Sequence, residues 1–192
     1  MLINKCTGLL DLACQVPSPN HNERPNPQDM SLIVLHNISL PPNEFGTPWI
    51  DALFTNQLPA DEHPFFAEIC HLRVSSHLLI RRTGEIVQYV PFHLRAWHAG
   101  VSSYQGREIC NDFSIGIEME GTDDQPFTEA QYNQLELVLD HLLKTYPSLQ
   151  KENITGHEHI APGRKTDPGE CFDWPRLADK FSADLPAKAR IE

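Results

Sequence analysis

Residues 155–167 bring two imidazoles, a lysine and a carboxylate together in the stretch Thr-Gly-His-Glu-His-Ile-Ala-Pro-Gly-Arg-Lys-Thr-Asp. Pro162 and Gly163 interrupt any helical or strand pattern in this stretch, and Pro168 follows it directly. We therefore expect a loop that holds polar side chains beside the element that precedes it. Loops of this kind commonly carry function.

The residue types in this segment suit a zinc site. His157 and Asp167 supply the nitrogen and oxygen ligands that zinc accepts, and Lys165 is a cation suited to stabilising an oxyanion. The best third ligand is His36, which closes the apolar run Ser-Leu-Ile-Val-Leu at the end of a predicted buried strand. His159 is a rival to His157. On an extended backbone these two rings project to opposite sides, so we expect only one of them to face the site.

Each of these residues also has an ordinary structural interpretation. The chain contains ten histidines, and a single histidine is more often exposed or hydrogen-bonded than bound to a metal. An isolated lysine such as Lys165 is usually a solvated surface charge. The combination of residue types in one short segment is what favours a site.

Two further segments carry polar side chains. Trp97, His98 and Arg107 stand in a loop-like region and suit the wall of a polar ligand pocket. A core Trp97 and an exposed His98 explain the same residues equally well. Residues 113–118 alternate as a strand that ends at Glu118, and a carboxylate at that position can act as a base.

Strands and helices must position these residues. Residues 31–35 predict a buried strand, residues 73–80 and 86–90 predict a hairpin with Gly84 in its turn, and residues 153–155 predict a last short strand. The clearest helix opens at the capping box Thr-Glu-Ala-Gln of residues 128–131 and stops at Pro147. Its predicted buried face contains Tyr132, Leu135, Val138, Leu139, Leu142 and Tyr146. Shorter helices are expected at 9–16, 49–58 and 174–181, the last capped by Asp173.

Length and composition indicate one α/β domain over residues 1–192, with residues 1–30 as an irregular segment packed on it and residues 186–192 as a frayed tail. The net charge of −11 argues against nucleic acid or an anionic membrane as a partner. The five cysteines are widely spaced and contain no C-x-x-C pair, which favours reduced thiols in the cytoplasm. Asp11 interrupts the only signal-like run near the start, so we expect a soluble protein that is not exported.

Five segments resemble the zinc-dependent N-acetylmuramoyl-L-alanine amidase family, which also includes phage lysozyme-type amidases and peptidoglycan recognition proteins. They are Val-Leu-His-Asn-Ile-Ser-Leu-Pro-Pro, His-Leu-Arg-Val-Ser-Ser-His-Leu-Leu-Ile-Arg-Arg, Arg-Ala-Trp-His-Ala-Gly-Val-Ser-Ser-Tyr-Gln-Gly-Arg, Asn-Asp-Phe-Ser-Ile-Gly-Ile-Glu and Thr-Gly-His with Arg-Lys-Thr-Asp-Pro-Gly. The resemblance implies a central mixed β-sheet flanked by helices. It also implies one zinc ion per chain, held by His36, His157 and Asp167, with Glu118 and Lys165 as catalytic residues.

The resemblance also implies a substrate. The most similar branch of the family cleaves 1,6-anhydro-N-acetylmuramoyl peptides between the lactyl group and L-alanine, in cytoplasmic peptidoglycan recycling, with an effect on β-lactamase induction. Six residues are then expected to line the substrate pocket: Asn37, Arg73, Trp97, His98, Arg107 and Arg164. The arginines would pair with substrate carboxylates. We expect no nucleic acid, membrane or obligate protein partner.

Two other classes of protein remain open. A non-catalytic peptidoglycan-binding module would share the fold but can dispense with a metal ligand, and release of the amide by the purified protein separates it from an enzyme. A non-haem iron oxygenase also uses two histidines and a carboxylate. Metal analysis and oxygen consumption separate that alternative.

Overall fold

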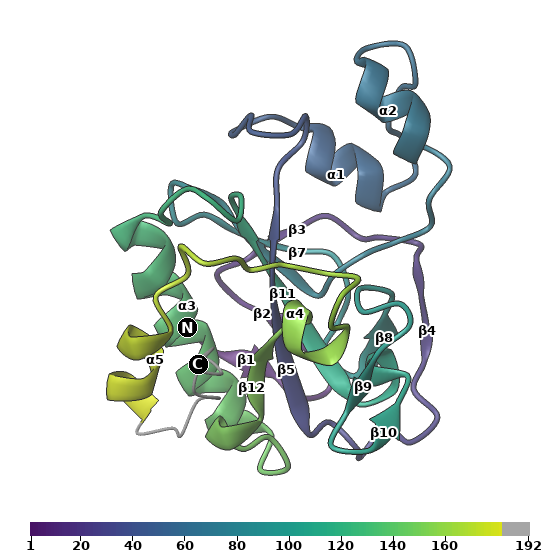
Figure 1. Ribbon diagram of the computed structural model, residues 1–192. Helices are drawn as coiled ribbons and strands as arrows, with labels where there is room; N and C mark the ends of the chain where they lie inside the picture. The colour runs from purple at the N-terminus through teal and green to yellow at the C-terminus, as the bar shows by residue number, and fades with distance from the viewer. Residues whose placement is uncertain (182–192) are drawn as a thin grey trace.

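The computed structural model describes residues 1–181, and the predicted frayed tail at residues 186–192 lies outside the described residues. A mixed sheet of six strands forms the centre of the molecule (Figure 1), which confirms the predicted fold class. In spatial order the strands are β12 (Ile154–Gly156), β5 (Leu32–Ile38), β11 (Ser114–Glu120), β6 (Leu78–Ile80), β7 (Ile86–Gln88) and β3 (Cys14–Gln15). The first four are parallel to their neighbours, β6 and β7 form the predicted antiparallel hairpin, and β3 runs parallel to β7.

The two faces of the sheet have different environments. Ile33 on β5 and Ile115 on β11 join a hydrophobic cluster with helix α3 (Glu129–Thr145). The alternate residues Leu32 and Val34 join a second cluster on the opposite face. Because side chains alternate along a strand, His36 falls on that second face together with Leu32 and Val34.

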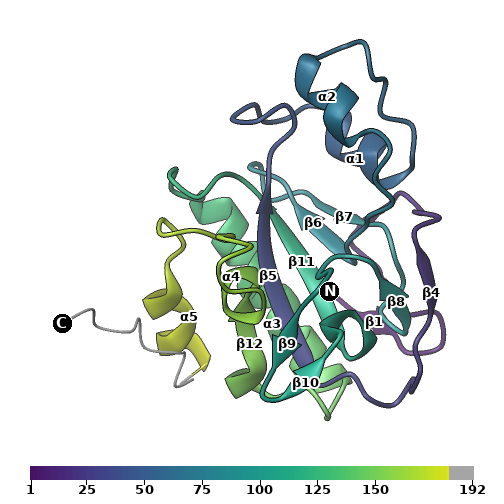
Figure 2. The ribbon, with the colours of Figure 1, turned by 45° about the vertical axis from the view of Figure 1, so that its right-hand side comes forward.

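The helices that cover the first face begin where the sequence predicted. Thr128 and Gln131 form both hydrogen bonds of the capping box at the start of α3. The backbone N–H of Arg176 donates to Oδ1 of Asp173, which caps helix α5 (Trp174–Phe181). Figure 2 shows α3 and α5 on the same side of the sheet.

Smaller elements surround the sheet. Helices α1 (Trp49–Phe54) and α2 (Pro64–Ile69) lie beyond the end of β5, as both ribbon views show (Figures 1 and 2). The smaller strands form the hairpins β1 (Ile3–Asn4) with β2 (Leu9–Leu10) and β9 (Ser103–Tyr104) with β10 (Arg107–Glu108), and the antiparallel pair β4 (His21–Glu23) with β8 (Leu94–Ala96). The remaining elements are 3-10 turns at Cys110–Asp112 and Lys151–Asn153 and helix α4 (His157–Ile160). No helix within residues 1–181 combines the length and apolar character needed to cross a membrane.

Several predicted boundaries were wrong. Residues 9–16 form no helix; they contain β2 and β3, and β3 extends the sheet because it pairs with β7. The first strand continues to Ile38 and includes His36. The helix expected over residues 49–58 ends at Phe54. The loop expected over residues 155–167 contains the short helix α4, which begins at His157.

Candidate metal centre and active site

Three adjacent parallel strands bring the central site residues together. His36 on β5 and Glu118 on β11 are register partners, so their side chains point to the same face of the sheet. His157 follows the end of β12, which pairs with β5 on its other side. Carboxyl ends of neighbouring parallel strands are a common place for ligand sites in α/β proteins.

Asp167 reaches this point through the loop that follows α4. The backbone N–H of Glu158 donates to the carbonyl oxygen of Asp167 at 2.9 Å, which closes the loop against α4. Gly156 permits this approach, because a Cβ atom there would lie only 2.8 Å from Cδ of Pro168. The glycine of the Thr-Gly-His motif therefore has a packing role directly beside the site.

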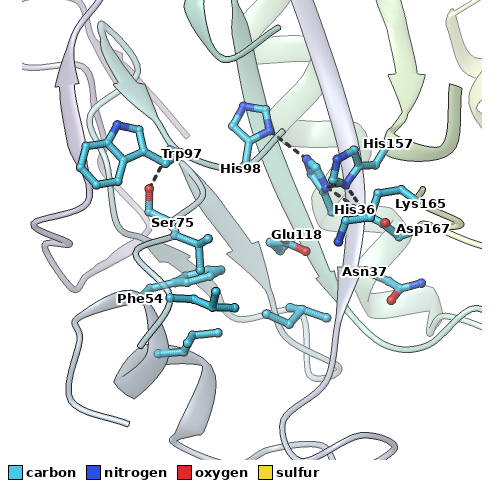
Figure 3. A pocket seen from close by; sticks show the side chains of 14 residues that line it. His36, Asn37, Phe54, Ser75, Trp97, His98, Glu118, His157, Lys165 and Asp167 are labelled. Carbon is cyan, nitrogen blue, oxygen red and sulfur yellow. Dashed lines mark hydrogen bonds and ion pairs between the residues drawn. The ribbon is translucent and has the colours of Figure 1, made fainter. Parts of the chain in front are cut away.

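The three predicted ligands form a nearly equilateral triangle of donor atoms (Figure 3). Nδ1 of His36 lies 3.0 Å from Nδ1 of His157 and 2.9 Å from Oδ2 of Asp167, and the third edge, from His157 Nδ1 to Asp167 Oδ2, measures 3.0 Å. Zinc–ligand bonds of about 2.0–2.2 Å in a tetrahedral site keep donors roughly 3.3–3.5 Å apart. The donor atoms lie slightly closer together than in a zinc-loaded site, and the triangle has the size expected for one zinc ion.

The chemistry of these donors also fits a cation. Nε2 of His157 lies 3.0 Å from the carbonyl oxygen of Ala99, which can only accept, so this nitrogen carries the proton. In that tautomer Nδ1 of His157 directs a lone pair at the carboxylate oxygen of Asp167. Two acceptors in contact repel each other unless a proton or a metal ion lies between them. The donor set therefore fits zinc.

Burial controls the charge of this cluster. Removal from water lowers the pKa of His36 to about 4, so its imidazole is neutral at neutral pH. Burial acts to raise the pKa of Asp167, but its contacts with His157 and His36 outweigh that effect and hold this pKa well below its ordinary value. A neutral imidazole and an ionised carboxylate are the forms that bind a metal.

The cluster opens into a pocket of about 220 Å³. Its lining includes Glu118 and Lys165 together with the three clustered side chains, and Leu53 and Phe54 of α1 contribute apolar walls. Oε2 of Glu118 is buried without a hydrogen-bond partner among the described residues. Burial and the nearby Asp167 raise the pKa of Glu118 well above its ordinary value, while the charge of Lys165 opposes that rise. A carboxyl group in this condition is suited to proton transfer.

Asn37 and Trp97 also line the pocket. Nδ2 of Asn37 donates to Oδ1 of Asp123 at 2.6 Å and to the carbonyl oxygen of Pro168 at 3.0 Å. The indole N–H of Trp97 donates to Oδ1 of Asn22 at 2.7 Å. The described structure therefore anchors both side chains at the edge of the pocket.

The three arginines expected at the substrate do not line this pocket. Arg107 is exposed, forms an ion pair with Asp29 at 2.5 Å and stacks over Phe113. Arg73 is also exposed, and its guanidinium lies 3.3 Å from the carbonyl oxygens of two preceding residues. Arg164 donates to the carbonyl oxygens of Ala99 and Val101 at 2.7 and 2.6 Å, beside the ring of His157.

The rival histidine lies elsewhere. The ring of His159 packs edge-on against Trp174, with a centroid distance of 6.1 Å. Among residues 1–181, the group of potential ligands whose donor atoms converge consists of His36, His157 and Asp167.

Sequence reasoning missed the residues that support the two clustered histidines. They are Ala99, Asn111, Ser114 and Gly116, and they act through backbone groups, an amide, a hydroxyl and a missing side chain. Their segments were noticed only as motifs, Trp-His-Ala-Gly and Asn-Asp-Phe-Ser-Ile-Gly-Ile-Glu. The alternation of β11 was a usable signal, because it places Ser114 and Gly116 on the same face as Glu118.

Comparison with known proteins points to one family. A sequence model described as N-acetylmuramoyl-L-alanine amidase matches residues 26–170. Over 170 residues the chain is 66% identical to the 1,6-anhydro-N-acetylmuramyl-L-alanine amidase AmpD of Salmonella typhimurium (strain SL1344), with 88% of this chain and 90% of that protein covered.

Solved structures agree with the sequence comparison. A crystal structure of a selenomethionine AmpD derivative superposes with a TM-score of 0.90 and 61% identity, covering 94% of this chain and 99% of that one. The amidase AmiD of Escherichia coli, in complex with anhydro-N-acetylmuramic acid-L-Ala-D-γ-Glu-L-Lys, gives a TM-score of 0.59 and 30% identity over 79% of this chain and 57% of that one.

Proposed function

The chain belongs to the N-acetylmuramoyl-L-alanine amidase family, and from that premise we propose that it hydrolyses 1,6-anhydro-N-acetylmuramoyl peptides with one zinc ion. The scissile bond is the amide between the lactyl group of the anhydromuramic acid and L-alanine. His36, His157 and Asp167 hold the zinc. The observation that carries this proposal is the triangle of donor atoms, with edges of 2.9–3.0 Å, at the base of the pocket.

The residues around the triangle have separate roles in amide hydrolysis. A bound zinc ion supplies Lewis acidity, which polarises the scissile carbonyl and makes a water molecule more acidic. Glu118 takes the proton of the attacking water and delivers it to the leaving amine, a role supported by its buried carboxyl and raised pKa. Lys165 stabilises the oxyanion that develops on the carbonyl oxygen.

The proposed substrate class has two supports. The AmpD relative described above bears the name of an anhydromuropeptide amidase, and the AmiD complex holds an anhydromuropeptide. Asn37 and Trp97 line the pocket, and we propose that they contact the sugar and peptide. Arg73, Arg107 and Arg164 are not among the residues that line the described pocket, so the proposed substrate class does not rest on them.

We also propose a biological setting that follows from this substrate. Anhydromuropeptides of wall turnover would be cleaved in the cytoplasm for recycling, and their removal would lower β-lactamase induction. Fractionation of cells that produce the protein at its natural level tests the location. Deletion of its gene, followed by measurement of β-lactamase after antibiotic exposure, tests the effect on induction.

The proposed reaction is tested with purified protein, anhydromuropeptide and intact sacculi. After metal removal and reconstitution, products are identified by mass spectrometry. We expect free peptide and anhydro-N-acetylmuramic acid from the zinc-loaded protein, and none after a chelator removes the metal. Binding without cleavage would instead indicate a peptidoglycan-binding module, and activity with iron and oxygen consumption would indicate an oxygenase.

A further inference from the structure

Both ring nitrogens of His98, a residue expected to contact substrate, are already engaged by the protein. Nδ1 lies 2.9 Å from Nε2 of His36 (Figure 3). Nε2 lies 3.1 Å from the hydroxyl oxygen of Ser114. A neutral imidazole has one donor and one acceptor nitrogen. Neither nitrogen of His98 is therefore left for a substrate, although the ring borders the pocket.

Metal binding through Nδ1 of His36 fixes the direction of donation along this chain of contacts. His36 turns Nδ1 towards Asp167, so a lone pair on Nδ1 requires the ring proton on Nε2. Nδ1 of His98 then accepts from His36, and Nε2 of His98 donates to Ser114. The contacts thus support the tautomer of His36 that presents Nδ1 to a metal, because each ring N–H in it has an acceptor.

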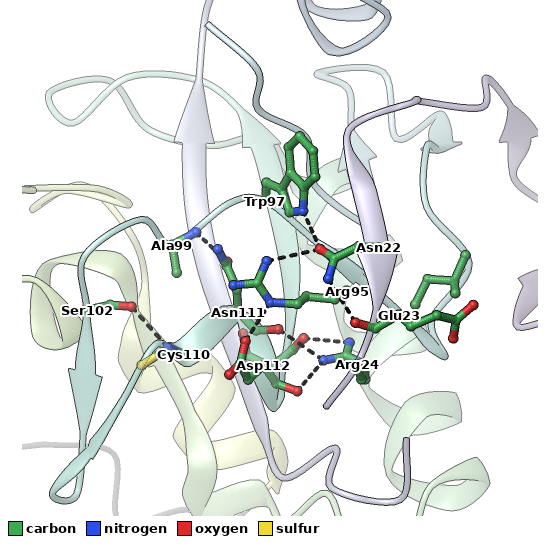
Figure 4. Close-up of polar contacts among 12 residues, drawn as sticks. Asn22, Glu23, Arg24, Arg95, Trp97, Ala99, Ser102, Cys110, Asn111 and Asp112 are labelled. Atoms are coloured by element: carbon green, nitrogen blue, oxygen red, sulfur yellow. Dashed lines mark hydrogen bonds and ion pairs between the residues drawn. The ribbon is translucent and has the colours of Figure 1, made fainter. Parts of the chain in front are cut away.

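The surrounding protein holds His98 in place. A Cβ atom at Gly116 would lie only 2.5 Å from Cγ of His98, so the ring occupies space that only glycine leaves open. Oδ1 of Asn111 accepts from the backbone N–H groups of His98 and Ala99, at 3.1 and 2.8 Å. Figure 4 shows the contact between Asn111 and Ala99. Ring and backbone are both fixed.

The next residue supports the second histidine. The carbonyl oxygen of Ala99 accepts from Nε2 of His157 at 3.0 Å, which leaves Nδ1 of His157 to face Asp167. Two consecutive residues therefore set the tautomers of both clustered histidines, one through its side chain and the other through its backbone. Asn111 fixes this pair.

We propose that His98 is a positioning residue, which fixes the tautomer and orientation of His36 for metal binding, and that it does not bind substrate. The inference rests on the proposed zinc site and adds the residues that orient its two histidines. Outer partners of ligating histidines typically change metal affinity by about 10–100-fold when they are removed. Loss of His98 should therefore weaken zinc binding directly.

A matched pair of variants tests whether the acceptor atom Nδ1 of His98 is what supports His36. Leucine and asparagine are similar in shape, but only asparagine keeps an acceptor close to the position of the imidazole Nδ1. Zinc affinity of the purified proteins is measured by competition with a chelator. We expect His98→Leu to weaken zinc binding by about 10–100-fold and His98→Asn by less than about tenfold.

Kinetics at saturating zinc separate positioning from substrate contact. If His98 bound substrate, both variants would raise KM while their zinc affinity equalled that of the wild type, and this result would overturn the inference alone. If the wild-type protein itself failed to bind zinc, the proposed function would fall and the inference with it.

A second measurement reads a tautomer directly. Nitrogen-15 NMR of the histidine rings in the zinc-loaded wild type should show His98 protonated on Nε2, the form whose Nδ1 accepts from His36, and His98 protonated on Nδ1 would overturn the inference. Should His98→Leu fail to fold, Ser114→Ala carries the test, because it removes the acceptor of the His98 Nε2 proton. We expect severalfold weaker zinc binding from Ser114→Ala, and unchanged affinity and tautomer would overturn the inference.

Discussion

Lys165 contributes charge at the site without the ability to coordinate a metal. Its ammonium lies near enough to influence the pKa values of both Glu118 and His36. If it meets the oxyanion, its contribution is largest in the transition state. Lys165→Ala should therefore lower kcat by roughly 10²- to 10³-fold, the range for one oxyanion donor, while zinc content and KM stay close to wild type.

Steady-state kinetics and metal analysis on one preparation measure this effect. Lys144→Ala, at an exposed position on α3, is the control and should leave kcat unchanged. Near-wild-type kcat in Lys165→Ala would make this lysine a bystander. A rise in KM alone would make it a substrate-binding residue.

Glu118 should determine the acid side of the pH profile. As a base it must be ionised, and burial raises its pKa, so activity should rise with pH at values above the ordinary glutamate pKa of about 4.3. Glu118→Gln should lower kcat by roughly 10²- to 10⁴-fold and retain zinc. Zinc content is measured at each pH beside kcat/KM, because loss of zinc in step with activity would assign the acid limb to the ligands instead.

For single residues, the sequence indicates which chemistry a side chain can perform better than where that side chain points. Two histidines and an aspartate are recognisable as possible ligands by type, and the structure brings those three residues together. Arginine side chains are long and serve equally well in ion pairs at a distance. The partner of Arg107 is Asp29, 78 positions earlier in the chain, and no local pattern predicts that contact.

At the scale of elements, predictions succeeded where the determinants are local. The capping box of α3 lies within four consecutive residues, and its helix begins as predicted. The helix predicted over residues 9–16 is absent because this segment bonds to a strand far away in the sequence: β3 pairs with β7, and the N–H of Leu10 donates to the side chain of Gln88 on β7. Tertiary pairing of this kind overrides a short apolar pattern.

Strand β11 offers a test of how closely an element fits its site. An alanine at position 116 would place its Cβ atom 2.5 Å from Cγ of His98. Gly116→Ala should therefore lower the free energy of unfolding by about 1–3 kcal/mol through overpacking. Denaturant unfolding of the metal-free protein measures the loss.

A double-mutant cycle identifies the cause of that loss. In a His98→Ala background the ring is absent, so Gly116→Ala should cost less, with a coupling of about 0.5–3 kcal/mol between the two positions. Additive effects would show that the alanine disturbs β11 itself and does not displace His98.

At the scale of the whole molecule, buried titratable groups make stability depend on pH. Burial lowers the pKa of His36 to about 4 and that of His77 to about 3. An unfolded histidine has a pKa of about 6.5. Below that pH the unfolded chain binds protons that the folded protein resists, so the metal-free protein should lose stability as pH falls from about 6.5 towards 4.

Urea unfolding at a series of pH values measures this slope. His77→Gln removes one of these buried groups and should make the slope shallower, whereas His71→Gln, at an exposed position, should leave it unchanged. An equal slope in His77→Gln and the wild type would contradict the assignment of the buried imidazole.

Glu118 should act in the opposite direction and so connect stability with catalysis. Its pKa is raised in the folded protein by burial, whereas an unfolded glutamate ionises near pH 4.3. Above that pH the unfolded chain releases a proton that the folded protein retains, so this group lowers the stability of the metal-free protein increasingly as pH rises towards its folded pKa.

Glu118→Gln keeps the size of the side chain and removes its ionisation. The variant should therefore be more stable than the wild type without metal, with a larger gain near pH 8 than near pH 4, while it loses activity. Unfolding experiments at both pH values decide this, with Glu108→Gln on exposed β10 as the control that should show no such difference. A gain of the same size at both pH values would mean that the carboxyl group is ionised alike in the folded and unfolded chains, and its suitability as the base would then have to come from the zinc-loaded site alone.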